Sequence, residues 1–233
     1  MVASSEPCKP PALLFDLDGT LIDSVPDIAA ALNTVLVRAG RHPLTDDEVT
    51  ALVGAGARTL VVRALDQTAP VGEPSIETST IDRLYQDFLA NYDAEPFSKT
   101  RLYPGAITAL KDVRQRGMKT AIITNKPHDL TLRILHGLEI AGLFDVVVGA
   151  SDARPLKPHR AMIDYALEQL SCDITQAAFI GDSGADVDAA KAAGIPVVLL
   201  THGYMNAEAG DLSADIVLDH FDSLASAIRQ LLG

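Results

Sequence analysis

The sequence predicts an α/β protein: a parallel β-sheet with helices between its strands, and an all-helical insert after the first strand. Short apolar runs that stop at turn residues are typical of buried parallel strands. The expected strands are 12–15, 119–124, 145–149, 177–180, 197–200 and 215–218. Because helical patterns separate most of the later runs, we expect a sheet wound by right-handed crossovers.

The helical patterns divide into two groups. In the part that alternates with strands, the expected helices are 104–116, 128–138, 159–170 and 185–193. From residue 23 to residue 99 the sequence indicates no strand, and the expected helices are 26–39, 45–52, 57–67 and 76–92, separated by glycine and proline loops. We therefore predict a core of residues 1–20 and 100–233 and a separate helical cap of residues 21–99.

Bulk composition narrows the possible functions. The chain has 233 residues, 48% of them hydrophobic, so it can bury one full α/β core and a modest second domain. Its formal net charge of -12 argues against nucleic-acid and anionic-membrane surfaces, because a field of that sign repels phosphate groups. It does not argue against a small anionic ligand, since a few cations can reverse the field inside one cleft.

No pattern in the sequence is typical of an exported or membrane protein. The two cysteines, Cys8 and Cys172, form neither a disulfide framework nor a zinc site, which fits a reducing compartment. The first residues lack the apolar segment of a secretory signal, and no apolar run approaches membrane-spanning length. We expect a soluble cytoplasmic protein, monomeric or homodimeric, without a nucleic-acid or membrane partner.

Polar side chains gather at the ends of the predicted strands. In a doubly wound sheet, ligands bind beyond the carboxyl ends of the strands. The side chains expected there are those of Asp16, Asp18, Thr124, Lys157, Asp182 and Asp186. Carboxylates close together repel one another unless a cation lies among them, and an acidic, oxygen-rich site with few protein ligands suits Mg²⁺.

This set of side chains can perform phosphoryl chemistry. Lys157 and the hydroxyl of Thr124 can hold phosphate oxygens. Asp16 and Asp18 are two residues apart around a tight turn, so one can attack phosphorus while the other passes a proton. Each element alone has a plainer interpretation, because Asp-x-Asp-Gly is typical of a turn and a lone lysine of a solvated surface. Their order and their common place at strand ends favour a site.

Four motifs together resemble those of the haloacid-dehalogenase superfamily. They are Asp16-Leu17-Asp18-Gly19-Thr20-Leu21-Ile22-Asp23-Ser24, Thr124-Asn125-Lys126, Lys157-Pro158 and Gly181-Asp182-Ser183-x-x-Asp186. The match covers nearly the whole chain after its polar leader, and the combination is specific. The resemblance implies a Rossmann-like three-layer core that carries a mobile cap, and the cap is expected to set the substrate.

The resemblance also implies a role for each core residue. Asp16 would be the nucleophile and Asp18 the general acid and base, while Lys157 would steady the nucleophile and the transferred group. Thr124 and the backbone of Asn125 would bind the phosphate. Asp18 is informative, because phosphatases and mutases of this superfamily use this acid and dehalogenases do not need it.

A magnesium site is implied in the same way. Mg²⁺ would be held by Asp16, the backbone carbonyl of Asp18 and Asp182, with Asp186 in support. The implied activity is that of a Mg²⁺-dependent phosphatase, which hydrolyses a small anionic phosphate monoester through an aspartyl-phosphate.

A glycine loop in the predicted cap bears on the substrate. Helix 57–67 begins directly after Gly56; free amides at a helix start favour an anion, and Arg58 adds a fork-shaped donor suited to a carboxylate. A simple helix–loop–helix turn with a surface arginine fits the same residues. Segment 52–60 is similar to the cap segment of bacterial phosphoglycolate phosphatases, which implies 2-phosphoglycolate as substrate, with its carboxylate at Gly56 and Arg58.

Other functions remain as alternatives. A sugar-phosphate or pyrophosphate phosphatase, or a β-phosphoglucomutase-like enzyme, would use the same core residues, although Thr20 and the glycine loop favour a phosphatase over a mutase. A non-catalytic receiver module also uses a phosphorylated aspartate, but carries it on the third strand, which here ends in Val148-Gly149. A dinucleotide-binding loop fails because a helix, not a strand, precedes Gly54.

Overall fold

The computed structural model describes residues 10–72, 76–204 and 212–233. Within these residues a sheet of six parallel strands has the order β5-β4-β1-β6-β7-β8. Its strands are β1 (Ala12–Phe15), β4 (Lys119–Pro127), β5 (Val146–Ala150), β6 (Ala177–Gly181), β7 (Val197–Leu200) and β8 (Ile216–Leu218). The predicted α/β fold is confirmed, and every predicted strand is present.

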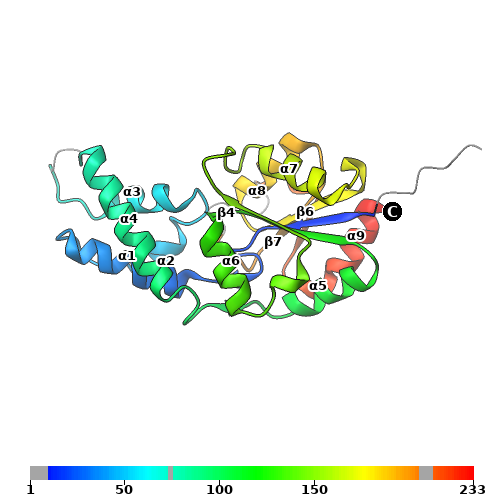
Figure 1. Cartoon of the computed structure of the whole chain (residues 1–233), viewed down its shortest axis with the longest axis horizontal. Helices are drawn as coiled ribbons and strands as arrows, with labels where there is room; N and C mark the ends of the chain where they lie inside the picture. The colour runs from blue at the N-terminus through cyan, green and yellow to red at the C-terminus, as the bar shows by residue number, and fades with distance from the viewer. Residues whose placement is uncertain (1–9, 73–75, 205–211) are drawn as a thin grey trace, which may run out of the picture.

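Helices cover both faces of the sheet (Figure 1). One face carries α5 (Ala106–Gln115), α6 (His128–Gly137) and α9 (Leu224–Leu232), and the other carries α7 (Ala161–Leu170) and α8 (Gly184–Ala193). Side chains alternate along β1, because Leu13 and Phe15 pack in the first core whereas Ala12 and Leu14 pack in the second. The result is the three-layer core expected from the sequence.

A helical insert follows the first strand. Its helices are α1 (Val25–Arg38), α2 (Asp46–Thr50), α3 (Ala57–Gln67) and α4 (Thr78–Ala94), and they lie together at one end of the core (Figure 1). The chain leaves through β2 (Ile22–Asp23) and returns through β3 (Arg101–Leu102), which pair in antiparallel fashion. The precise boundary of the cap, at residues 20/21 and 99/100, stays a prediction.

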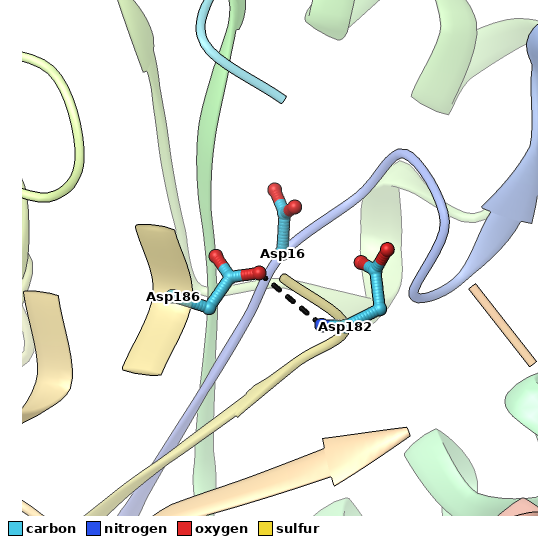
Figure 2. A group of neighbouring side chains, drawn as sticks. All are labelled: Asp16, Asp182 and Asp186. Atoms are coloured by element: carbon cyan, nitrogen blue, oxygen red, sulfur yellow. Dashed lines mark hydrogen bonds between the residues drawn. The ribbon is translucent and has the colours of Figure 1, made fainter. Parts of the chain in front are cut away.

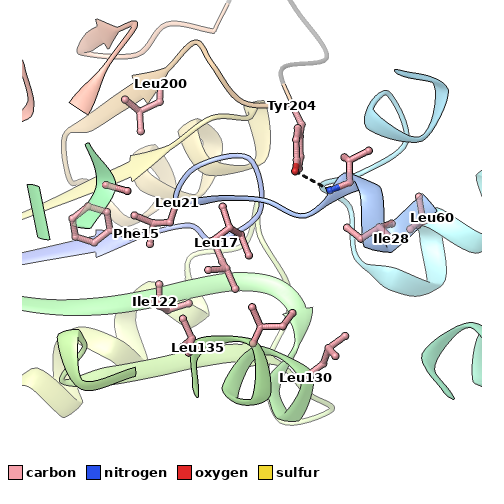
Figure 3. Packing of buried hydrophobic residues seen from close by; sticks show 14 of the residues in the cluster. Phe15, Leu17, Leu21, Ile28, Leu60, Ile122, Leu130, Leu135, Leu200 and Tyr204 are labelled. Atoms are coloured by element: carbon pink, nitrogen blue, oxygen red, sulfur yellow. Dashed lines mark hydrogen bonds between the residues drawn. The ribbon is translucent and has the colours of Figure 1, made fainter. Parts of the chain in front are cut away.

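The insert is fixed to the core at its two linkers and by apolar packing. The carboxylate of Asp27, which is 4% exposed, accepts hydrogen bonds from the backbone N–H groups of Lys99 and Thr100 and from Thr100 Oγ1. One apolar cluster runs from the sheet into the insert and includes Ile28 and Leu60 (Figure 3). These contacts hold the insert against the core.

The strand order changes direction between β1 and β6. The chain proceeds from β1 to β4 and β5 on one side, and then from β6 to β7 and β8 on the other. In open α/β sheets this switch point opens a crevice at the carboxyl ends of the strands. No helix in the described part of the chain is long and apolar enough to cross a membrane.

Candidate active site

Three buried carboxylates meet at the switch point of the sheet. Asp16 directly follows β1, Asp182 directly follows β6, and Asp186 lies in the first turn of α8. One oxygen of each carboxylate lies within 4.8 Å of the others, and Figure 2 shows the three side chains around one space. Their meeting follows from the topology, because β1 and β6 are neighbours with parallel register.

Glycines allow the backbone to approach these carboxylates. Gly19 has a φ of +84°, and a Cβ added to it would lie 2.2 Å from Asp182 Oδ2. A Cβ on Gly181 would lie 2.5 Å from Asp186 Cβ. Any larger residue at either position would push a carboxylate out of place, so the glycines are part of what builds the site.

Lys157 bridges two of the carboxylates. Its Nζ lies 2.8 Å from Asp16 Oδ1 and 2.6 Å from Asp186 Oδ1, and its side chain is 2% exposed. The other oxygen of Asp186 accepts hydrogen bonds from the backbone of Asp182 and from the backbone and hydroxyl of Ser183. Asp186 is therefore fully engaged in holding Lys157 and the start of α8.

The three carboxylates carry more negative charge than Lys157 alone can balance. Burial raises the pKa of Asp16 to about 7, against the opposing effect of Lys157 and with the added repulsion of Asp186. Burial, together with the negative charges of Asp186 and Asp16, also raises the pKa of Asp182 well above its ordinary value. Three carboxylates and one ammonium leave an excess of negative charge that a divalent cation would offset.

The donor set fits a hard divalent cation. Asp16 Oδ1 lies near Lys157 Nζ but accepts no well-aligned hydrogen bond among the described residues. Asp182 is held in place by Thr20 Oγ1 at 2.6 Å and by the backbone N–H of Tyr204 at 2.7 Å. The ligand atoms that the three aspartates offer are carboxylate oxygens, which is the ligand type that Mg²⁺ prefers.

The irregular end of β4 supplies the opposite wall. The register with β5 shifts between Ile123 and Pro127, and the buried residues Thr124 and Asn125 lie in this stretch. Asn125 Nδ2 donates to the carbonyls of Gly54 at 2.9 Å and Lys157 at 3.0 Å, and its Oδ1 accepts from the backbone N–H of Lys157. The Asn125 side chain therefore joins the cap's glycine loop to the loop of Lys157.

A cavity of about 60 Å³ lies between the core and the helical insert. The core contributes Asp16, Asp18, Thr124 and Asp182 to its lining. The insert contributes mostly apolar atoms, from Gly56, Leu60, Phe88 and Tyr92 among others. The predicted residues Asp16, Asp18, Thr124, Asn125 and Asp182 thus line one cavity together with Gly56. Lys157, which contacts Asp16, and Asp186 are not among the residues that line it.

Arg58 is not brought to this cavity, which corrects the predicted contact of its side chain with the substrate. Its guanidinium donates to Asp82 of α4 from Nη2 at 2.8 Å and from Nε at 3.2 Å, and the side chain is 48% exposed. The physical reason is direction: Gly56 caps α3 at the cavity, and the residue two positions later faces the neighbouring helix. Lys126 and Tyr92, for which the sequence predicts no role, do line the cavity.

A family model described as haloacid dehalogenase-like hydrolase matches residues 13–200. The chain belongs to the haloacid dehalogenase-like hydrolases. The resemblance predicted from the four motifs is confirmed, and as a member of this family the chain is a hydrolase. The matched residues include the strand ends that carry Asp16, Thr124, Lys157 and Asp182.

Individual relatives agree with this family. The chain is 35% identical to a phosphoglycolate phosphatase of Cereibacter sphaeroides, over 95% of this chain and 99% of the relative. It is 42% identical to one of Colwellia psychrerythraea, over 82% and 84%. A crystal structure of a predicted phosphoglycolate phosphatase from Haemophilus somnus superposes with a TM-score of 0.88 at 29% identity, over 95% of this hydrolase and 99% of that chain.

Proposed function

We propose that this hydrolase is a Mg²⁺-dependent phosphatase that cleaves a small phosphate monoester through a phosphorylated Asp16. The observation that carries the proposal is the position of Asp16, buried at the end of β1 beside Lys157 and within reach of two further carboxylates. A carboxylate so placed can act as a nucleophile, because nearby cations offset its repulsion of the negatively charged phosphate group.

In the first step Asp16 attacks phosphorus. A bond forms between its carboxylate oxygen and phosphorus, the ester P–O bond breaks, and the leaving alkoxide takes a proton from Asp18. Lys157, the hydroxyl of Thr124 and the backbone N–H of Asn125 hold the phosphoryl oxygens as their charge redistributes.

In the second step water attacks phosphorus of phospho-Asp16. Asp18, now ionised, takes a proton from that water; the bond between phosphorus and the Asp16 oxygen breaks, and inorganic phosphate leaves. Asp16 is regenerated as a carboxylate, and Asp18 is again protonated for the next cycle. One acid and base thus serves both halves of the reaction.

The cation site completes the proposal. Asp16, Asp182 and the backbone carbonyl of Asp18 would hold Mg²⁺, and Asp186 would support them by fixing Lys157 and the start of α8. When bound, Mg²⁺ supplies positive charge that offsets the repulsion between a carboxylate nucleophile and a phosphate dianion.

The proposed substrate is 2-phosphoglycolate, which would be cleaved to glycolate and phosphate. The names of the relatives support this choice. The small cavity fits a short ester, and the backbone amides that follow Gly56 at the start of α3 can meet its carboxylate. A sugar phosphate is the alternative, but Leu60 and Phe88 offer no polar atoms for sugar hydroxyls.

The cellular setting belongs to the same proposal. Residues 21–99 would act as the cap that sets substrate specificity, and the cavity would close when they lie against the core. The enzyme would work in the cytoplasm as a monomer or homodimer, on a small anionic ester and without a nucleic-acid or membrane partner.

A substrate screen tests the proposal. Purified protein with Mg²⁺ would be assayed for kcat/KM on 2-phosphoglycolate, sugar phosphates and pyrophosphate, beside Asp16→Asn. We expect 2-phosphoglycolate to exceed the others by about tenfold or more, and Asp16→Asn to lose turnover by a factor of about 10⁴. A best substrate without a carboxylate would overturn the substrate, and an active Asp16→Asn enzyme would overturn the chemistry.

A further inference from the structure

The carboxylate of Asp18 is held from two sides. Lys126 Nζ lies 2.8 Å from its Oδ1 and 3.0 Å from its Oδ2, so the ammonium contacts both oxygens. Ser24 Oγ donates to Oδ1 at 2.5 Å. With both oxygens engaged, rotation of the carboxylate would break at least one of these contacts, so its direction in the cavity is set by its neighbours.

Lys126 is itself almost completely buried. Its side chain is 3% exposed, and that of Asp18 is 13% exposed. A buried ammonium is costly unless its hydrogen bonds are satisfied, and Lys126 satisfies them with Asp18 and with the hydroxyl of Tyr92 at 2.7 Å. Few other positions are therefore open to the Lys126 side chain.

Tyr92 brings the helical insert into this contact. It lies near the end of α4, and its ring is also under the ammonium, with Lys126 Nζ 4.6 Å from the ring centroid. Burial raises the pKa of Tyr92 to about 12, so its hydroxyl stays neutral while it accepts from Lys126. A cap residue, a core lysine and Asp18 thus form one continuous chain of contacts.

We propose that Lys126 is a positioning residue that aims the Asp18 carboxylate, and that Tyr92 makes this aim depend on the cap lying against the core. This inference rests on the proposed role of Asp18 as acid and base. If the cap moves away, Tyr92 leaves with α4, and Lys126 loses both a hydrogen bond and the ring that covers it. Asp18 is then aligned only when the cavity is closed, so proton transfer is favoured only while the cap lies against the core.

The test compares Lys126→Met and Tyr92→Phe with wild type on two probes. The leaving group of 2-phosphoglycolate needs a proton from Asp18, whereas that of acetyl phosphate leaves without one; hydrolysis of phospho-Asp16 needs Asp18 with both. We expect Lys126→Met to lower kcat on 2-phosphoglycolate by about 100-fold and Tyr92→Phe by about threefold to tenfold. With acetyl phosphate, the acid-quenched phosphoenzyme fraction should rise above that of wild type in both variants.

Matched controls separate positioning from folding. Lys119→Met removes a lysine from the opposite end of β4, and Tyr85→Phe removes a hydroxyl from the same helix as Tyr92. Both controls should keep kcat within about twofold and leave the phosphoenzyme fraction unchanged. Tyr92→Phe keeps the ring and so provides a well-folded variant if Lys126→Met is unstable.

The outcomes are distinct. If both variants lose kcat equally on the two probes and the phosphoenzyme fraction does not rise, Lys126 does not position Asp18. Full activity of Tyr92→Phe and Lys126→Met would overturn the positioning role in the same way. Wild type remains an active phosphatase in both cases. A wild-type protein that never forms phosphoenzyme would instead overturn the proposed function.

Discussion

At the scale of single residues, Asp16 combines two opposing demands. It must be ionised to attack phosphorus, yet burial raises its pKa to about 7, with Lys157 lowering it and Asp186 raising it. Between about pH 4 and pH 7 the folded, metal-free protein therefore binds a proton at Asp16 that the unfolded chain does not bind. The stability that this group contributes is present at low pH and is lost as pH rises through about 7.

This titration predicts how Asp16→Asn changes stability. Without Mg²⁺, the variant should melt above wild type by roughly 5 °C at about pH 8, because it removes a buried charge, and the gap should shrink at about pH 5. Differential scanning calorimetry with a chelator measures both gaps. A gap that stays constant or widens toward low pH would contradict the raised pKa of Asp16, and saturating Mg²⁺ should stabilise wild type selectively.

Single residues also show where sequence patterns stop predicting a site. Asp16, Thr124, Lys157 and Asp182 could be placed together because each ends or follows a predicted strand, and the ends of parallel strands share one edge of a sheet. Arg58 could not, because its direction depends on the neighbouring helix and on Asp82 there. Tyr92 and its contact with Lys126 join distant segments, and no spacing along the chain records that meeting.

At the scale of elements, Asp27 joins the two linkers of the cap. It lies in the first turn of α1 and accepts from the backbone of Lys99 and Thr100 just before β3. Replacing it with alanine leaves the buried N–H group of Thr100 and the partly buried N–H group of Lys99 without their acceptor. We expect Asp27→Ala to lower the free energy of unfolding by about 2–4 kcal/mol in urea titrations.

A surface control makes that prediction specific. Asp66→Ala changes an exposed aspartate on α3 and should alter the free energy of unfolding by less than about 0.5 kcal/mol. If Asp27→Ala unfolds at the same urea concentration as wild type, the Asp27 contact does not hold the linkers together.

Helices and strands were predictable where the sequence shows a helical spacing of apolar residues or an apolar run with clear ends. Helix α3 has the predicted bounds, because its apolar residues have helical spacing after Gly56. Strands β1 and β7 agree residue for residue, because Pro11 and Pro196 precede their apolar runs and polar residues end them. The pair β2 and β3 was not predicted, since two-residue strands carry no period and form only when the linkers meet. Helix α9 was missed although its buried Leu224, Ala227 and Ile228 have helical spacing.

At the scale of the whole molecule, the charge opposes the proposed substrate. The chain carries a formal net charge of -12, and 2-phosphoglycolate is also negatively charged, so the two repel. Among the described residues that line the cavity, Lys126 carries the one positively charged side chain, and it already pairs with Asp18. The long-range field should therefore slow encounter, and only contacts inside the cavity favour binding.

Added salt should consequently help this enzyme. Raising KCl from about 20 mM to about 200 mM at saturating Mg²⁺ shortens the Debye length and should increase kcat/KM for 2-phosphoglycolate about twofold to fivefold. The increase should be smaller for methyl phosphate, which carries less charge. A fall in kcat/KM with salt would show instead that a local positive field steers the substrate.

The central claim is that Asp16 receives the phosphoryl group, and trapping that intermediate tests it most directly. Enzyme mixed with Mg²⁺ and ³²P-labelled 2-phosphoglycolate would be quenched in acid within milliseconds, reduced with borohydride and mapped by mass spectrometry. Borohydride converts an acyl phosphate to homoserine, so the account predicts acid-stable label on the protein before reduction and homoserine at position 16 after it. Turnover without labelled protein, or homoserine at another aspartate, would contradict it.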